Sequence, residues 1–115
     1  MLHNRIVEPA ASHVLSLGRR VDATSAPGLE AECCALLENN ELRLVVLDMS
    51  DLEYISSAGL KVILFLAQSL RPRQGEVRFV ALKPQVRDIF SMSGFMSLFQ
   101  EYSSVASALD ARAPG

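Results

Sequence analysis

Short apolar segments alternate along the chain with longer segments in which apolar residues recur every three or four positions. Strictly apolar or alternating runs of this length indicate strands, and the longer spacing indicates amphipathic helices. Strands are predicted at Ile6–Glu8, Val14–Leu17, Leu44–Leu47, Val77–Leu82 and Ser97–Glu101, with a turn at Pro9–Ser12 joining the first two. Helices are predicted after Thr24 or Ser25, from near Ser57 to Leu70, from Pro84 towards Gly94, and after Ser103 or Ser104. This alternation predicts an α/β layer fold.

Two segments predict where the core lies. Leu44–Leu47 is a continuous apolar run, as expected for a central strand that is covered on both faces. The helix that starts near Ser57 is apolar nearly all round, because Val62, Phe65 and Leu66 widen its hydrophobic face. We therefore expect this helix to be heavily buried.

The helix after Thr24 contains the two cysteines of the chain, Cys33 and Cys34. Adjacent cysteines rarely satisfy disulfide geometry, and no Cys/His spacing typical of zinc sites is present. The pair is interpreted either as one buried and one rim position on the helix or as a redox switch. Asn39 and Asn40 are expected to end this helix.

Composition narrows the class of protein. The 115 residues are 50% hydrophobic and 21% charged, with a net charge of −2, which fits one globular domain over residues 1–115 with a short disordered tail at about 112–115. The near-neutral charge gives no basic footprint, so nucleic acid is not expected as a partner. No apolar run approaches the ~20 residues that span a bilayer, and no secretory signal is recognised. We expect a cytoplasmic protein without membrane insertion.

The most unusual segment runs from Asp48 to Leu60, where the predicted central strand ends in an acidic, hydroxyl-rich loop that leads into a helix. In open α/β sheets this edge commonly carries function, and the unpaired N–H groups of a helix start stabilise an anion such as a phosphate on serine. A second loop, Gly18–Thr24, also follows a strand and precedes a helix, so the two loops are expected on the same edge.

The same residue types also have a purely structural interpretation. Ser56 or Ser57 can act as the N-cap of the helix, and Asp22 or Asp48 can accept hydrogen bonds from its own loop. Spacing alone does not choose between a cap and a phosphorylation site.

Several of these segments together resemble the STAS domain family, and in particular the anti-sigma factor antagonists of bacterial partner-switching systems. Asp48–Ser50 followed by Tyr54–Leu60 (YISSAGL) is similar to the family signature. Gly18–Thr24 resembles its glycine, arginine, aspartate loop with one extra basic residue, and Pro84–Gly94 resembles its third helix and the following loop. The resemblance extends from about Val14 to Leu109.

The resemblance implies a single STAS-like domain with a mixed four- to five-stranded sheet and about four helices packed mainly on one face. It also implies a function. The unphosphorylated protein would bind an anti-sigma factor that is also a serine kinase of the histidine-kinase-like ATPase fold, and so free the kinase's other client. Phosphorylation would turn binding off, and a PP2C-type phosphatase would restore it.

The family acceptor is the serine two positions before the motif glycine, which corresponds to Ser57. Many members have aspartate immediately before the acceptor, whereas this chain has Ser56, which becomes a second candidate acceptor. Gly59 is interpreted either as allowing close approach of a partner or as tight internal packing, and Lys61 either as a partner-facing or as a solvated charge. Met92 and Phe95 are candidates for an apolar rim, with core packing as the alternative. The residues expected to contact the partner are Asp22, Thr24, Asp48, Ser50, Ser56, Ala58, Gly59, Lys61, Met92 and Gly94.

Intrinsic catalysis is not expected. The chain has no Gly-x-Ser-x-Gly elbow and no P-loop, and its histidines, His3 and His13, have no evident acid partner. Neither a cofactor nor a metal is predicted. The alternative function is a STAS subunit or scaffold of another assembly, such as a lipid or ion transporter complex or a stressosome-like complex, without a phospho-switch.

Overall fold

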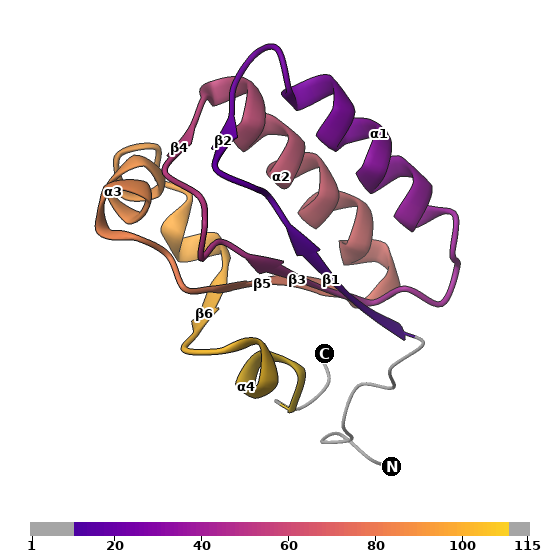
Figure 1. Ribbon diagram of the computed structural model, residues 1–115. Helices are drawn as coiled ribbons and strands as arrows, with labels where there is room; N and C mark the ends of the chain where they lie inside the picture. The colour runs from indigo at the N-terminus through magenta and orange to yellow at the C-terminus, as the bar shows by residue number, and fades with distance from the viewer. Residues whose placement is uncertain (1–10, 111–115) are drawn as a thin grey trace.

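The structure is a computed structural model in which residues 11–110 are described, and strands and helices alternate through that range as predicted (Figure 1). The strands are β1 (Ser12–Ser16), β2 (Arg20–Val21), β3 (Leu44–Asp48), β4 (Tyr54–Ile55), β5 (Glu76–Val80) and β6 (Gln100–Tyr102). The α-helices are α1 (Ala26–Leu37), α2 (Ser57–Leu70), α3 (Pro84–Met92) and α4 (Val105–Asp110), and two short 3-10 helices are η2 (Arg71–Arg73) and η3 (Met96–Leu98).

The main sheet has the strand order β1-β3-β5-β6, and β2 and β4 form a separate two-stranded sheet. Every pairing among residues 11–110 is parallel, whereas a mixed sheet was predicted. The strand predicted at Ile6–Glu8, which would run antiparallel to β1 in a hairpin, lies outside the described residues, as does the predicted tail at 112–115. The α/β class and the central position of β3 are confirmed.

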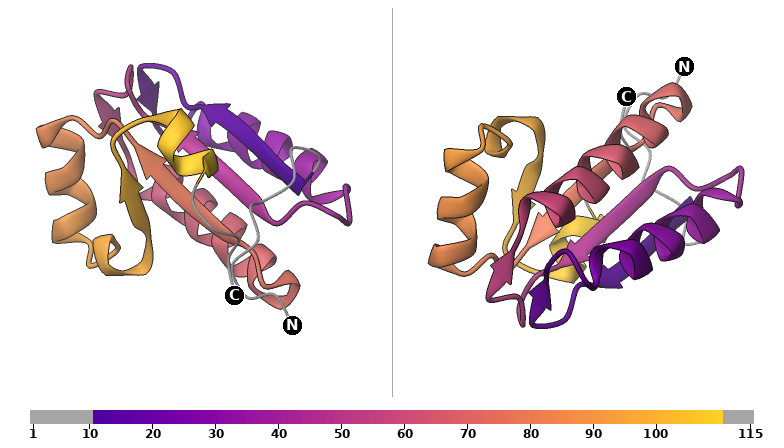
Figure 2. Two further views of the ribbon diagram at one scale, coloured as in Figure 1. Left: turned by 90° about the horizontal axis from the view of Figure 1, so that it is seen from below. Right: turned by 90° about the horizontal axis from the view of Figure 1, so that it is seen from above.

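Three of the four α-helices pack on one side of the sheet. The larger buried cluster joins α1, α2 and α3 to one face, and α4 covers the opposite face (Figures 1 and 2). This placement follows from chain chirality, because successive right-handed crossovers between parallel neighbours put their helices on the same side. The expectation of helices mainly on one face is therefore confirmed.

The continuous apolar run of β3 faces buried side chains on both sides of the sheet. Val45 and Leu47 point into the larger cluster, and Leu44 and Val46 point into the smaller cluster beneath α4. All four are buried, so a polar residue at any of them would lose its hydration. The run is therefore needed on both faces.

Arg78 on β5 is a buried cation that the sequence pattern did not single out. Its side chain is on the α4 side of the sheet, with only 2% of the residue exposed. The guanidinium forms an ion pair with Glu76 and donates a hydrogen bond to the carbonyl oxygen of Ala108 at 2.7 Å, and it lies 5.3 Å from the ring centre of Tyr102. Arg78 therefore ties α4 to the sheet.

Some boundaries differ from prediction. The β5 strand ends at Val80 rather than at Leu82, because Ala81 has a left-handed φ of 62° that breaks the extended backbone. The last strand begins at Gln100, after the turn of η3, rather than at Ser97. On α2, Phe65 was expected to widen the buried face but is 37% exposed.

Candidate functional site

The two loops singled out in the sequence meet through the β2–β4 pairing. Arg20 lies opposite Tyr54 and Val21 opposite Ile55. The Ser56 N–H donates to the Val21 carbonyl at 2.8 Å, which closes the ladder directly before α2. The loops therefore share one edge of the molecule, as predicted, and a short parallel ladder replaces the continuous loops that were expected.

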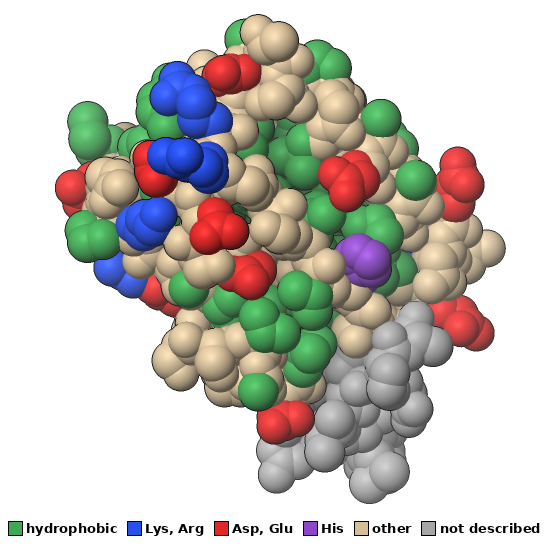
Figure 3. Space-filling model, in the orientation of Figure 1, with side chains coloured by type: hydrophobic (Ala, Val, Ile, Leu, Met, Phe, Trp, Pro, Cys, Tyr) green, Lys and Arg blue, Asp and Glu red, His purple; other side chains and the backbone are tan. Residues whose placement is uncertain are grey.

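Charged side chains are interleaved on this edge, where Figure 3 shows cations and carboxylates side by side over the β2, β4 and α3 region. Arg19 pairs with Glu53 at 3.2 Å, and Lys83 approaches the same carboxylate at 3.9 Å. Arg20 lies 3.6 Å from Asp22 and 4.7 Å from the ring centre of Tyr54. Both arginines of the first loop, Arg19 and Arg20, are thus already paired with neighbouring carboxylates.

Asp22 organises the start of α1. Its Oδ1 accepts the backbone N–H groups of Thr24 at 3.0 Å and Ser25 at 3.1 Å, and the Ser25 hydroxyl donates to the same oxygen at 3.3 Å. The backbone N–H of Ser25, chief among these donors, holds the pKa of Asp22 below its ordinary value. Asp48 acts similarly on its own loop, because its Oδ1 accepts the Ser50 N–H at 3.0 Å.

The two adjacent serines have different roles at the start of α2. Ser56 is the half-buried N-cap, and its Oγ accepts the Gly59 N–H at 3.2 Å. Ser57 is the first helical residue and is exposed, and its hydroxyl makes no hydrogen bond within residues 11–110. The cap interpretation therefore applies to Ser56, and Ser57 presents an unengaged hydroxyl at the surface.

Gly59 is buried beneath these serines. A Cβ atom at this position would lie 2.7 Å from Ile55 Cγ1 and 2.7 Å from Val21 Cγ1, well inside van der Waals contact. The glycine lets α2 approach the β2–β4 ladder closely. Its burial supports the packing alternative for Gly59, and contact of Gly59 with a partner stays a prediction.

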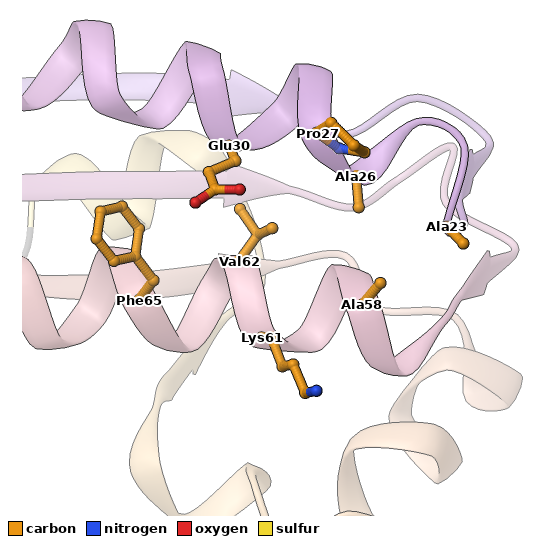
Figure 4. A pocket seen from close by; sticks show the side chains of 8 residues that line it. All are labelled: Ala23, Ala26, Pro27, Glu30, Ala58, Lys61, Val62 and Phe65. Carbon is orange, nitrogen blue, oxygen red and sulfur yellow. The ribbon is translucent and has the colours of Figure 1, made fainter.

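A groove of about 370 Å³ lies between the N-terminal halves of α1 and α2 (Figure 4). Figure 4 shows Ala58, Val62 and Phe65 of α2 pointing towards α1, from which Glu30 points back, whereas Lys61 extends away from α1. The groove was missed by the sequence reasoning. The signal for this groove in the sequence was that α2 carries more apolar residues than the core alone requires. Its lining comprises Ala23, Ala26, Pro27, Glu30, Ala58, Lys61, Val62 and Phe65.

Met92 and Gly94 are not brought together with the serines. They belong to the C-terminal end of α3, which is the end farther from β4 in both views of Figure 2. Met92 is 87% exposed, whereas Phe95 packs against the main core. Gly94 has a left-handed φ of 75° and donates its N–H to the Ser91 carbonyl, so it ends the helix as a cap.

The two cysteines occupy one buried and one exposed position on α1, which agrees with the structural interpretation of the pair. Cys33 is buried and Cys34 exposed. Desolvation by burial, with smaller contributions from nearby charges, raises the pKa of Cys33 to about 11. Within residues 11–110, no three His, Cys, Asp or Glu residues are grouped to hold a metal, and no helix is long and apolar enough to cross a membrane.

Comparison with known proteins identifies the family of this fold. The STAS domain model matches residues 5–108. A Bordetella bronchiseptica protein named "Putative anti-sigma factor antagonist BtrV" is 51% identical over 79 residues, which cover 69% of this chain and 67% of that protein.

Solved structures agree with this assignment. An anti-sigma factor antagonist from Mycobacterium paratuberculosis is 25% identical, with a TM-score of 0.76 over 93% of this chain and 90% of its own. The unphosphorylated form of SpoIIAA shares the fold at 16% identity, with a TM-score of 0.73 over 91% and 92% of the two chains. Its phosphorylated form, from Bacillus, superposes with a TM-score of 0.67 over 91% and 96% at 14% identity. The chain thus belongs to the STAS domain family, which confirms the resemblance found in its sequence.

Proposed function

We propose that this protein is an anti-sigma factor antagonist whose binding is switched off by phosphorylation of Ser57. One observation carries the choice of residue: Ser57 is exposed with an unengaged hydroxyl, whereas the Ser56 oxygen is occupied in capping α2. The names of the Bordetella relative and of the Mycobacterium structure support the antagonist role. SpoIIAA, which has the same fold, exists in unphosphorylated and phosphorylated forms.

The partners that fit this role are an anti-sigma factor with serine kinase activity and a PP2C-type phosphatase, acting in the cytoplasm. The kinase transfers the γ-phosphoryl group of ATP to Ser57 Oγ, the hydroxyl proton is lost, and ADP leaves. The phosphatase hydrolyses the ester with water, giving serine and inorganic phosphate. The antagonist itself binds and is modified; it does not catalyse.

Phosphorylation changes the surface without requiring the domain to refold. The phosphate adds a charge of roughly −1.5 to −2 at the first residue of α2, where the helix dipole favours an anion. The same group disturbs a partner surface shaped for a hydroxyl, and the Asp22 carboxylate on the adjoining loop adds like charge. A penalty of about 3 kcal/mol lowers affinity by about two orders of magnitude.

The test is to incubate the protein with its cognate kinase and ATP and to map the phosphate by mass spectrometry. Ser57→Ala should abolish phosphorylation and keep kinase binding, whereas Ser57→Asp should weaken binding. Ser56→Ala is the matched control: it should lose about 1 kcal/mol of stability with its cap and still accept phosphate at Ser57.

Two outcomes would contradict the proposal. Absence of phosphate from Ser57 would contradict the choice of residue, and equal kinase binding by the two Ser57 variants would show that the modification does not control binding. If the protein instead co-purifies stoichiometrically with a transporter and no kinase, the subunit role in another assembly replaces the antagonist role.

A further inference from the structure

Lys61 is the cation best placed to respond to a phosphate on Ser57. The two residues are four positions apart on α2 and both are exposed. Four residues advance about 6 Å along an α-helix and return to nearly the same face, so side chains at this spacing meet. The order also matters, because an acidic group N-terminal to a lysine at this spacing is more favourable than the reverse.

The ammonium of Lys61 has no ion partner within residues 11–110. Other cations of this edge are already paired: Arg19 and Lys83 with Glu53, and Arg20 with Asp22. Lys61 is also the only lysine or arginine in α2. A new anion at the start of α2 therefore finds one uncommitted cation on its own helix.

Lys61 also lies at the surface that a partner would cover. It lines the groove between α1 and α2 next to Ala58, and Figure 4 shows its side chain extending away from α1 rather than towards Glu30. An exposed ammonium beside an apolar groove suits a carboxylate at the rim of a protein interface.

We infer that Lys61 is the counter-ion exchanged in the switch: it pairs with a carboxylate of the partner in the unmodified protein and with the phosphate once Ser57 is modified. Phosphorylation then removes an attractive contact from the complex in addition to placing a repulsive group in it. This inference rests on the proposed function, which supplies the phosphate and the partner. It gives Lys61, a residue that is not itself phosphorylated, a part in the regulation.

The pairing is testable without a kinase, on protein with phosphoserine encoded at position 57. The second pKa of the phosphate, near 6 for free phosphoserine, is followed by phosphorus NMR during a pH titration. An ammonium favours the dianion, so Lys61→Gln should raise this pKa by about 0.3 pH unit, and Lys61→Arg should leave it near the wild-type value. The carboxylates of Glu30 on α1 and Asp22 before α1 are common to all variants, so the difference isolates Lys61.

Lys83→Gln is the matched control, since it makes the same change to a lysine that is already paired with Glu53. It should leave the titration unchanged. If Lys61→Gln gives the same titration as wild type, or if Lys83→Gln has an equal effect, the pairing is overturned.

The exchange is tested by measuring how tightly the cognate kinase binds four proteins: wild type and Lys61→Gln, each with and without phosphate. Lys61→Gln should weaken the unmodified complex about tenfold and leave the phosphorylated complex almost unchanged. Phosphorylation would then cost about tenfold less affinity in the variant. Strictly additive effects would overturn the exchange, whereas absence of phosphate from Ser57 would overturn the proposed function and leave the titration result standing.

Discussion

Replacing Gly59 by alanine tests how tightly α2 is packed against the β2–β4 ladder, on which the position of Ser57 depends. The added methyl group would lie 2.7 Å from a γ-carbon of Ile55 and 2.7 Å from one of Val21. Both neighbours are buried β-branched side chains with restricted rotamers. Neither can turn away into solvent, so the helix or the ladder must shift.

Two opposing effects set the size of the change. Overpacking a core by one methyl group costs about 1–3 kcal/mol, because rotamers and backbone are displaced. Alanine is favoured over glycine inside a helix by about 0.8–1 kcal/mol, which partly offsets this cost. We expect Gly59→Ala to lower the free energy of unfolding by about 1 kcal/mol.

Gly28→Ala provides the matched control, because it makes the same chemical change in the first turns of α1. A Cβ atom there meets no other atom within 4 Å. Only the conformational term remains, so this variant should be more stable than wild type by about 0.5 kcal/mol. Denaturant unfolding followed by circular dichroism should therefore show midpoints displaced in opposite directions.

A different result would show that Val21 and Ile55 have room to move: Gly59→Ala would then unfold at the same denaturant concentration as wild type or higher, while Gly28→Ala behaved as expected. The close approach of α2 to the ladder would then not explain the glycine.

Three further predictions concern other residues. Arg78→Met should lower the free energy of unfolding by about 3 kcal/mol in urea, because Glu76 and a buried carbonyl lose their partner; an unchanged midpoint would contradict this. Because the pKa of Cys33 is about 11, roughly one Cys33 thiol in a thousand is ionised at pH 8. A thiol reagent should therefore react rapidly with Cys34 in wild type and only slowly with Cys34→Ser protein. The pKa of Asp22 is lower in the folded than in the unfolded state, so its carboxylate stabilises the fold above about pH 4 and this contribution is lost on acidification through the folded pKa. In Asp22→Asn protein the denaturant midpoint should therefore fall less steeply below that pH than in wild type. Equal slopes of midpoint against pH in the two proteins would show that the carboxylate contributes nothing.

Periodicity was sufficient for the elements that bury many side chains. The continuous run of β3 and the nearly all-round apolar face of α2 were recognised because burial leaves a dense pattern over several residues. The interpretation of the adjacent cysteines as one buried and one rim position agrees with the structure, in which Cys33 is buried and Cys34 is exposed.

Features that depend on few residues or on tertiary contacts were not predicted from the sequence. The β2 and β4 strands have two residues each, too short for an alternating pattern to emerge from loops. The buried position of Arg78 depends on α4 reaching back over the sheet, a contact about 30 residues away in sequence. Phe65 lines the groove between α1 and α2, and the placement of two helices against each other is a tertiary feature that no local pattern encodes.

The choice between Ser56 and Ser57 shows how such a missed element decides the candidate site. The Ser56 N–H completes the β2–β4 ladder by donating to Val21, so Ser56 has an extended backbone at the point where α2 begins. Its hydroxyl then accepts the Gly59 N–H, and Ser57, the first helical residue, is exposed. Serine and aspartate are equally good N-caps, so Ser56 preserves the helix start that the aspartate common in the family would provide. Relative to that aspartate, Ser56 lacks a negative charge beside Ser57. Under the switch proposed above, Lys61 would therefore have no competing carboxylate on its own helix turn once Ser57 is phosphorylated.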